Sequence, residues 1–392
     1  MTSPLHVLVV LPGLEMGGSE KATCRLLNAI DRKLIRMSVA VFKSSGACLR
    51  LVPEDVPVHI LGPHSGLKRI RTVLRLARLV RRERVEVVYA VLDSANIVAL
   101  FARLLGILPT PLLIGVRCNY RWGLGKGVRW RRVKRLLVRL LYPRADRILC
   151  VTDEALRVIA EDFGVPKNRC DVLGNVVPSV GRPSHPSDGA DALGDWLSGA
   201  VPLFLAIGRL IEVKQFDKLL EAFQLVRNET AARLLIIGEG PDRPRLESLV
   251  HRLGLSDQCR LPGEILDPMP CMQRAASLVV TSRAEGFPNV VAEALACGLR
   301  VISFDWAEPV VRMIEATKLG EVVQRDNHEA LASAMLRVLQ VGPAFGEDGV
   351  NGPYLTNHSM GTEPGAYERV FVSVARAGVI RSRGPVRAFA ER

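Results

Sequence analysis

The chain has 392 residues, 48% of them apolar and 24% charged, which is the composition of a soluble globular protein with room for two domains. Its net charge of +13 is uneven: residues 1–178 carry 30 Lys and Arg against 14 Asp and Glu, and the remainder carries 23 against 26. Because the positive excess lies entirely in the first part, we expect that part to face an anion such as membrane lipid, a lipid diphosphate or nucleic acid.

The sequence disfavours a metal site of cysteines, a signal peptide and a membrane span. The eight cysteines form no Cys-x-x-Cys pair and no metal spacing, so we expect small core residues in a reducing cytosol. The apolar run at residues 6–12 is too short for a signal peptide and lacks a basic segment before it. The apolar stretch at residues 87–116 is interrupted by charged residues and prolines, which argues against a membrane span.

The first 178 residues alternate short apolar runs with helical patterns. The expected strands are 6–11, 38–42, 58–61, 85–91, 112–116 and 148–151, and the expected helices are 19–30, 67–82 and 96–106. A long basic segment separates the last two strands. This alternation predicts a parallel sheet with helices on both faces.

Residues 177–199 are rich in Pro, Ser, Gly and Asp, as in an interdomain linker or a long surface loop. A second α/β series follows, with strands at 203–207, 233–237, 260–261, 278–281 and 301–304 and helices at 216–226 and 242–253. Residues 342–365 are again loop-like, and residues 367–377 fit a closing helix. We therefore predict two Rossmann-like domains, 1–178 and 201–366, a linker at 179–200, and a C-terminal helix and tail at 367–392. Such a pair of domains has a cleft between them in which a substrate would bind.

Two glutamates, Glu285 and Glu293, bracket a short loop and the first turns of a predicted helix. The apolar run before them is a strand, so Glu285 is expected at the carboxyl end of a parallel strand, where open α/β sheets bind ligands. Gly286 and Pro288 mark a turn, and the helix opens near Asn289. Free amides at such a helix start suit a phosphate or a sugar hydroxyl. The alternative is an ordinary strand–turn–helix with two surface glutamates.

This spacing resembles the Glu-x7-Glu signature of family-4 retaining glycosyltransferases, which have the GT-B fold and use nucleotide sugars. The resemblance implies that Glu285 holds hydroxyls of the donor sugar and that Glu293 holds the ribose hydroxyls. It also implies donor contacts from the loop between them, formed by Gly286, Phe287, Pro288 and Asn289.

Gly208 and Arg209 follow a predicted strand, and Lys214 comes shortly after them. A glycine that admits close approach, a bidentate guanidinium and a lysine suit a diphosphate, although a solvated basic turn is the alternative. The segment resembles the Gly-Arg-Leu…Lys-Gly-Phe-Asp motif of the same family, with Gln215 in place of the second glycine. This resemblance assigns Arg209 and Lys214 to the departing diphosphate.

Three further glycines follow the next strands of the second domain. Gly238 and Gly240 match the Gly-x-Gly-Pro of the family and are given a structural role. Gly263 and Ile265 fall where family members hold the nucleotide base with backbone groups.

In the first domain, Gly17 and Gly18 lead the first strand into a helix, where backbone amides can face a phosphate. A simple glycine turn capped by the following serine competes with that reading, and the family's Gly-Gly-x-Glu loop favours donor phosphate or acceptor binding. Arg117 and Asn119 resemble the Arg-x-Asn of a sub-branch that makes lipid-linked oligosaccharides and polysaccharides. Arg117 would then grip an acceptor phosphate, with a structural ion pair as the alternative.

Two further departures from the family are visible. Many members carry a histidine just after the strand at 85–91, whereas this chain has none there and none of its seven histidines occupies an obvious catalytic position. The segment 303–312 lacks the Gly-Pro-x-Glu loop of the family, and Glu308-Pro309 is its nearest remnant, which puts one donor contact in question.

Residues 121–147 contain ten basic residues and one acidic residue, interleaved with Trp122, Trp130 and several leucines. A basic amphipathic helix of this kind suits an anionic membrane surface. Nucleic acid is the competing anion, although no nucleic-acid motif accompanies the segment, and an ordinary charged helix face is the third reading. We expect a cytoplasmic protein bound peripherally to the inner face of the cell membrane.

The resemblance implies transfer of a hexose or N-acetylhexosamine from a nucleotide diphosphate sugar, with retention of configuration. UDP-sugar is favoured and GDP-mannose is possible, and the acceptor is a lipid-linked or polysaccharide glycan of the cell envelope. No Asp-x-Asp follows a strand, so no metal or other cofactor is expected. Two alternatives stay open: a binding protein of this fold that has lost turnover, and a basic nucleic-acid-associated α/β protein.

Overall fold

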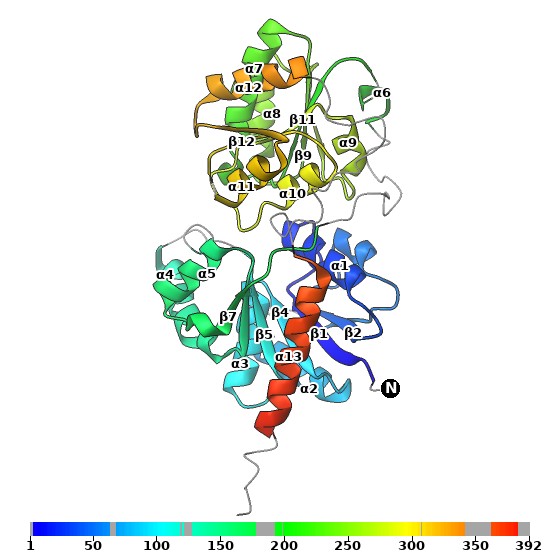
Figure 1. Cartoon of the computed structure of the whole chain (residues 1–392), viewed down its shortest axis with the longest axis vertical. Helices are drawn as coiled ribbons and strands as arrows, with labels where there is room; N and C mark the ends of the chain where they lie inside the picture. The colour runs from blue at the N-terminus through cyan, green and yellow to red at the C-terminus, as the bar shows by residue number, and fades with distance from the viewer. Residues whose placement is uncertain are drawn as a thin grey trace, which may run out of the picture. The chain divides into compact units, whose positions relative to one another are not determined.

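The computed structural model describes residues 3–62, 68–117, 120, 128–177, 193–197, 199–306, 308–341 and 362–382, with the backbone alone at 68–69, 128–131, 195 and 379–382. The chain divides into two compact units, Met1–Val176 with Thr362–Arg392, and Val177–Gly361. Each unit contains one parallel sheet with helices around it (Figure 1).

The first unit is built on a parallel sheet of order β3-β2-β1-β4-β5-β6-β7. Its strands are β1 (Leu5–Leu11), β2 (Ile35–Val41), β3 (Val58–Ile60), β4 (Val87–Val91), β5 (Leu112–Val116), β6 (Arg147–Cys150) and β7 (Cys170–Val172). Its helices are α1 (Gly18–Ala29), α2 (Lys68–Arg82), α3 (Asp93–Leu104), α4 (Val128–Leu141), α5 (Asp153–Phe163) and α13 (Pro364–Ser382).

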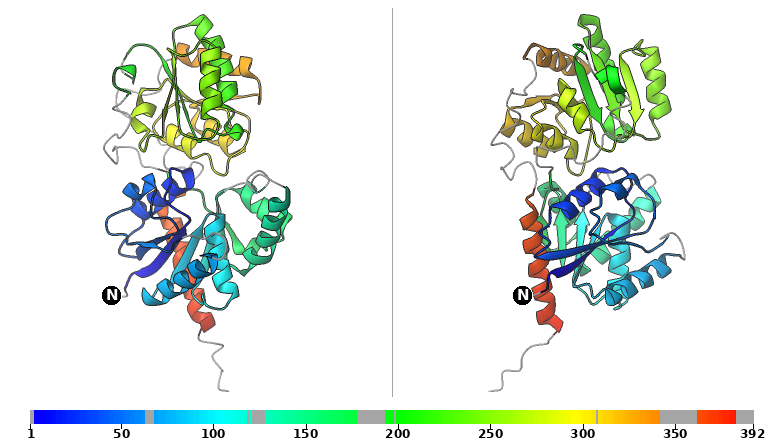
Figure 2. Two further views of the ribbon diagram at one scale, coloured as in Figure 1. Left: turned by 180° about the vertical axis from the view of Figure 1, so that it is seen from behind. Right: turned by 90° about the vertical axis from the view of Figure 1, so that its right-hand side faces the viewer.

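The central strands β1, β4 and β5 are buried almost throughout and mostly apolar, because helices cover both faces of the sheet (Figure 2). Alternate residues of β1 enter two different clusters: Leu8 and Val10 pack with α2–α5, and Val7 and Val9 pack with α1 and α13. Cysteines behave as predicted, since the seven that the structure describes are all buried and free.

The C-terminal helix belongs to the first unit. Tyr367, Phe371 and Val374 of α13 are buried in the cluster that also contains β1 and β4, and the helix lies along that sheet in Figure 1. Contacts therefore place residues 362–366 with the first unit, whereas the sequence pattern assigned them to the second. Sequence patterns report which face of a helix is apolar but not which sheet will cover it.

The second unit has a parallel sheet of order β10-β9-β8-β11-β12-β13. Its strands are β8 (Leu203–Ile207), β9 (Arg233–Ile237), β10 (Cys259–Gly263), β11 (Ser277–Val280), β12 (Val301–Phe304) and β13 (Gly320–Val323). Its helices are α6 (Gly194–Leu197), α7 (Phe216–Glu229), α8 (Arg243–Arg252), α9 (Met269–Arg274), α10 (Asn289–Ala296), α11 (Glu308–Thr317) and α12 (His328–Val341).

The strand order of this second sheet reverses between β8 and β11, which pair with each other although β9 and β10 lie between them in the chain. The loops that leave the carboxyl ends of these two strands meet at the reversal point. In open α/β sheets this point is where ligands bind. The loops are the ones that carry Gly208, Arg209 and Glu285.

Two segments that the sequence left open are structured in part. The predicted linker at 179–200 lies mostly outside the described residues, but Trp196 of α6 is buried, and the Arg233 and Arg260 guanidinium carbons lie 5.3 and 4.9 Å from the centroid of its ring. Within 303–312, α11 begins at Glu308. A Pro at the second helical position is compatible with a helix start, so the Glu-Pro pair opens this helix.

Candidate active site

Glu285 lies just beyond β11 and is bonded by two side chains. Lys214 Nζ is 2.7 Å from Glu285 Oε1, and Ser282 Oγ donates to the same oxygen at 2.6 Å. The side chains of Lys214 and Glu285 are only 15% and 12% exposed, and Ser282 is 2% exposed. The structure therefore brings together two residues that are 71 positions apart in the chain, and it adds a serine that sequence reasoning missed.

The loop after β11 is tied to the turn that carries Lys214. Thr281 Oγ1 donates to the carbonyl of Lys214 at 2.8 Å, and the amide of Arg283 donates to the carbonyl of Val213 at 2.8 Å. These bonds join the ends of β8 and β11 through their loops, so the Lys214–Glu285 pair rests on a fixed backbone.

Gly208 makes room for Lys214. A Cβ at Gly208 would lie 3.0 Å from Lys214 Cε and 3.2 Å from Nζ, so a side chain here would push the lysine away. Arg209 is exposed, and its guanidinium makes no hydrogen bond or ion pair to any residue that the structure describes. One cation is thus held beside Glu285, and a second extends toward solvent from the same loop.

Gly238 and Gly240 have structural roles, in agreement with the prediction. A Cβ at Gly238 would be 2.0 Å from the carbonyl oxygen of Gly208, and one at Gly240 would be 2.2 Å from that of Leu210. The amide of Gly208 donates to the carbonyl of Ile237, and the amide of Gly238 donates to that of Gly263. The loops after β8, β9 and β10 are therefore packed backbone against backbone.

The loop from Gly286 to Asn289 offers fewer free amides than predicted. The amide of Asn289 donates to the carbonyl of Phe287 at 2.9 Å, and Pro288 has no N–H. The amides of Gly286 and Phe287 donate to no residue that the structure describes. These two amides are the ones that remain for a ligand.

Glu293 and Ile265 are both largely buried. Glu293, in the second turn of α10, is 9% exposed, and the side chain of Ile265 is 3% exposed. The roles given to Glu293, Gly263 and Ile265 stay predictions.

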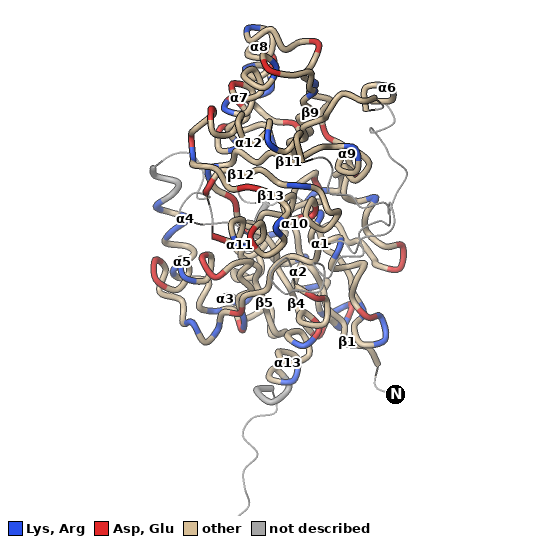
Figure 3. The backbone as a smooth tube through the Cα atoms, turned by 45° about the horizontal axis from the view of Figure 1, so that its top comes forward, with Lys and Arg blue, Asp and Glu red and all other residues tan. Residues whose placement is uncertain are grey.

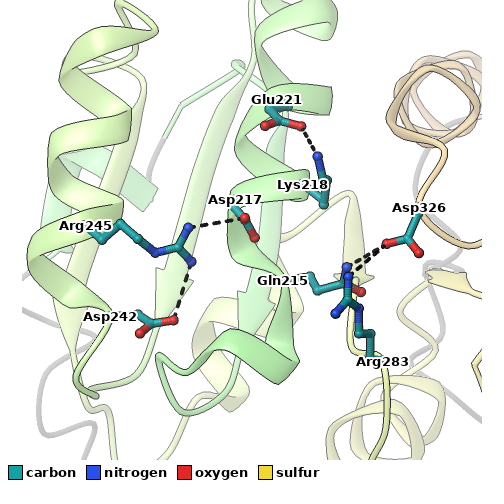
Figure 4. A network of polar contacts seen from close by, with 8 residues as sticks. All are labelled: Gln215, Asp217, Lys218, Glu221, Asp242, Arg245, Arg283 and Asp326. Atoms are coloured by element: carbon teal, nitrogen blue, oxygen red, sulfur yellow. Dashed lines mark hydrogen bonds and ion pairs between the residues drawn. The ribbon is translucent and has the colours of Figure 1, made fainter.

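Gln215 stands in the turn after Lys214 with a left-handed backbone, at φ 49° and ψ 40°. This conformation favours glycine, which explains why the related motif has one. The chain compensates through the side chain: Gln215 Nε2 donates to Asp326 Oδ1 at 2.7 Å, within a group of polar contacts that also includes Arg283 (Figure 4). Gln215 thereby ties the Lys214 turn to the loop after β13.

Two replacements of Gln215 separate the cost of its left-handed backbone from the contribution of its hydrogen bond to Asp326. Gln215→Ala loses the bond to Asp326 and keeps the strained φ, whereas Gln215→Gly loses the same bond but relieves the strain. We expect Gln215→Ala to be the less stable variant by about 1 kcal/mol. Urea unfolding of the two variants measures this difference, and equal stabilities would contradict the role of φ.

In the first unit, Gly17 and Gly18 begin α1 as expected, but a carboxylate lies beside them. A Cβ at Gly17 would be 2.2 Å from Glu20 Oε2, so the Glu20 side chain folds back over the helix start. A phosphate at this helix N-terminus would have to displace Glu20. Phosphate binding by Gly17 and Gly18 stays a prediction with this added condition.

Arg117 is buried inside the first unit. Its guanidinium donates to Tyr89 Oη at 2.7 Å, to Tyr367 Oη at 3.3 Å and to Asn175 Oδ1. Burial raises the pKa of the Tyr89 phenol, so the hydroxyl stays neutral. This geometry favours the structural alternative over a grip on an acceptor phosphate, because Arg117 ties β4 and β5 to α13. Asn119 lies outside the described residues.

A polar cluster that the sequence did not reveal lies at the carboxyl end of β4. Asp93 follows Leu92, which has a strained φ of 74°, and Asp93 accepts hydrogen bonds from Tyr120 and Tyr142. Lys134 of α4 forms an ion pair with Asp93. The cluster fixes α4 to the start of α3 through one inward-facing lysine.

The outward face of α4 combines exposed apolar and basic side chains. Val133, Leu136 and Leu140 are 46%, 57% and 52% exposed, and their spacing places them on one face of the helix. Arg132 and Arg139 are exposed on the same helix, which Figure 3 draws with its Lys and Arg in blue. Trp130 and the side chains of Arg129 and Arg131 lie outside the described residues, as does Trp122.

Two searches of the described residues gave no site. Within those ranges no helix has the length and hydropathy needed to cross a membrane. The same part of the chain contains no cluster of three His, Cys, Asp or Glu side chains suited to a metal ion. The expectation that no cofactor is needed stays a prediction.

The family is given by comparison with known proteins. Residues 197–344 match the model of glycosyl transferases group 1, and residues 17–176 match the glycosyl transferase 4-like domain. Both matches are to glycosyltransferase domains, they together cover most of the chain, and the chain has the GT-B fold. It is therefore a glycosyltransferase.

Similar proteins include two from Campylobacter jejuni. The chain is 26% identical over 348 residues (85% of this chain and 89% of the relative) to its N-acetylgalactosamine-N,N'-diacetylbacillosaminyl-diphospho-undecaprenol 4-alpha-N-acetylgalactosaminyltransferase. It is 26% identical over 344 residues (86% and 89%) to an alpha-1,4-N-acetyl-D-galactosaminyltransferase whose named acceptor is also PP-undecaprenol-linked. Among solved structures, Anabaena HepE in complex with UDP-glucose has a TM-score of 0.70 at 17% identity, covering 96% of this chain and 98% of that one.

Proposed function

We propose that this glycosyltransferase transfers a hexose or N-acetylhexosamine from a UDP-sugar to a lipid-linked acceptor, with retention of configuration. The observation that carries the proposal is the Lys214–Glu285 pair, held by Ser282 at the reversal point of the second sheet. Support for the donor comes from the UDP-glucose complex of HepE, and support for the acceptor from the undecaprenol-linked substrates named for the two Campylobacter relatives.

The chemistry we assign follows from the charges. In the transition state negative charge grows on the departing diphosphate, which Lys214 and Arg209 neutralise. Because Glu285 already accepts two hydrogen bonds and is paired with Lys214, we assign it to binding a sugar hydroxyl and not to nucleophilic attack. The acceptor hydroxyl would attack the anomeric carbon on the face from which the phosphate leaves, and the departing phosphate oxygen would take its proton.

A donor screen tests this proposal. Purified protein is incubated with UDP-glucose, UDP-N-acetylglucosamine, UDP-N-acetylgalactosamine and GDP-mannose, with an undecaprenyl diphosphate-linked sugar as acceptor. We expect a UDP-sugar to be consumed, with the same rate in EDTA because Lys214 and Arg209 supply the positive charge. Consumption of GDP-mannose alone would overturn the choice of nucleotide, and loss of activity in EDTA would overturn the metal-free scheme.

We further propose that the first unit binds an anionic membrane surface through α4 and that the protein is peripheral, at the cytoplasmic face where its acceptor lipid lies. The outward face of α4 has the composition of an interfacial helix, with exposed leucines between arginines. Lys134 is the exception, since it faces inward to Asp93. A nucleic acid would use the arginines but not the leucines.

Binding to lipid vesicles separates the contribution of the α4 arginines from that of the α4 leucines. We expect Arg132→Ser with Arg139→Ser to weaken binding to phosphatidylglycerol vesicles about 30-fold at low salt, at ~1 kcal/mol for each arginine. Leu136→Ser with Leu140→Ser should weaken binding by a similar factor that salt does not change. Val341→Ser, at a residue 65% exposed on the other unit, is the control. Wild-type protein that stays in the supernatant at low salt would refute the membrane proposal.

A further inference from the structure

Both side-chain hydrogen bonds to Glu285 end on one of its two carboxylate oxygens. Lys214 Nζ and Ser282 Oγ lie 2.7 and 2.6 Å from Oε1. Oε2 accepts no hydrogen bond from any residue that the structure describes. The side chain keeps 12% exposure, which leaves Oε2 as the oxygen open to a ligand.

Ser282, in the loop after β11, differs from the buried serines within the strands of that sheet. Ser277 Oγ, at the start of β11, donates to the carbonyl of Leu278, and Ser303 Oγ, in β12, donates to that of Phe304. Those bonds stay within the local backbone. Ser282 instead donates to a side-chain carboxylate at the ligand-binding edge of the sheet, so its hydroxyl fixes the orientation of Glu285.

Fixing one oxygen matters because the terminal torsion of a glutamate is soft and roughly two-fold. With one donor alone the carboxylate can turn about that torsion, whereas two donors on Oε1 hold the plane of the group. The backbone of Ser282 is itself held on both sides, by the Thr281 bond to Lys214 and the Arg283 bond to Val213. The serine is thus a short donor on a rigid support.

Lys214 alone cannot keep Glu285 Oε1 in place once the nucleotide sugar binds. Its ammonium has three protons on a flexible stem, and in the proposed function it also contacts the diphosphate. The Ser282 hydroxyl has a single proton and no such second task. When Lys214 turns toward the diphosphate, Ser282 is the donor that stays on Oε1.

We propose that Ser282 is a positioning residue that holds Glu285 Oε1 so that Oε2 accepts a hydrogen bond from a hydroxyl of the donor sugar. The inference rests on the proposed function, since it needs a nucleotide sugar at this site. It predicts that Ser282 affects the binding of the sugar and not the binding of the nucleotide.

Calorimetry with three matched pairs tests the inference: UDP and UDP-glucose, GDP and GDP-mannose, ADP and ADP-glucose. For the pair that wild type binds, we expect Ser282→Ala to weaken the nucleotide sugar about tenfold and to leave the nucleoside diphosphate within about twofold. Ser282→Thr, which keeps the hydroxyl, should restore most of the loss. Ser277→Ala is the matched control, because it truncates a fully buried serine of β11 that does not contact Glu285.

A cycle with Glu285→Ala, which removes the acceptor of the Ser282 hydrogen bond, completes the test. If Ser282 acts through the carboxylate, Ser282→Ala should weaken sugar binding much less in the Glu285→Ala background than in wild type. Two results would overturn the inference while leaving the donor site intact. Ser282→Ala could keep the full wild-type difference in affinity between the nucleotide sugar and the nucleoside diphosphate, or it could weaken the binding of both ligands equally. Wild type that binds each nucleotide sugar no better than its nucleotide would overturn the donor-sugar site itself and the role of Ser282 with it.

Discussion

Glu285→Gln is expected to lower the rate of glycosyl transfer by at least about 10²-fold, because the substitution removes the negative charge that meets the donor sugar and Lys214. The amide keeps the size of the side chain and can still accept from Ser282. In the structure the Glu285 side chain is only 12% exposed and lies beside Lys214. We therefore expect a loss of about 1–2 kcal/mol in unfolding free energy, and a folded protein at room temperature.

Turnover of the donor and urea unfolding are the two measurements for this variant. The matched control is Glu212→Gln, which neutralises an exposed carboxylate on the same short turn as Lys214. The control should keep both activity and stability. A Glu285→Gln protein with near wild-type turnover would remove Glu285 from the active site.

Lys214→Ala and Arg209→Ala should both weaken nucleoside diphosphate binding about 10–100-fold and leave uridine binding unchanged, because each removes a charged donor to the phosphates. Their effects on stability should differ. Lys214 is the ion-pair partner of Glu285, whose side chain is only 12% exposed, so the loss of Lys214 also lowers the melting temperature. Arg209 is exposed and has no side-chain partner among the described residues, so its loss should not.

Calorimetry with UDP and with uridine, together with thermal melting, measures both parts of this prediction. The comparison of the two ligands isolates the phosphate contribution, and the comparison of the two variants isolates the ion pair. Equal losses for uridine and UDP would show that the substitutions disturb the pocket as a whole. Equal melting temperatures would contradict the burial of the Lys214–Glu285 pair.

Much of the architecture follows from local sequence. Runs such as Leu112–Val116 and Leu203–Ile207 are apolar throughout and match the observed strands, because strands covered on both faces need no alternation. The position of Glu285 after β11 also follows from the strand pattern and the Gly-Phe-Pro turn. The edge strands β7 and β13 were not predicted, because they have only three or four residues and partly exposed side chains.

The partners of the candidate site residues were harder to predict. The hydrogen bond from Ser282 to Glu285 depends on the rotamers of both side chains. The burial of Arg117 depends on a contact with Tyr367, which lies 250 residues later in the chain. Local patterns carry no information on such long-range contacts. Gln215 was visible as a departure from a glycine motif, but its compensation by Asp326, 111 residues later, was not.

The configuration of the product tests the central claim most directly. Proton NMR of the glycosidic linkage formed by wild-type protein from an α-configured UDP-sugar and an undecaprenyl diphosphate-linked acceptor should show an α-linkage, and Glu285→Gln should form it at least about 10²-fold more slowly. A β-linked product, or an α-linked product formed equally fast by Glu285→Gln, would contradict retaining transfer at the site built from Glu285 and Lys214.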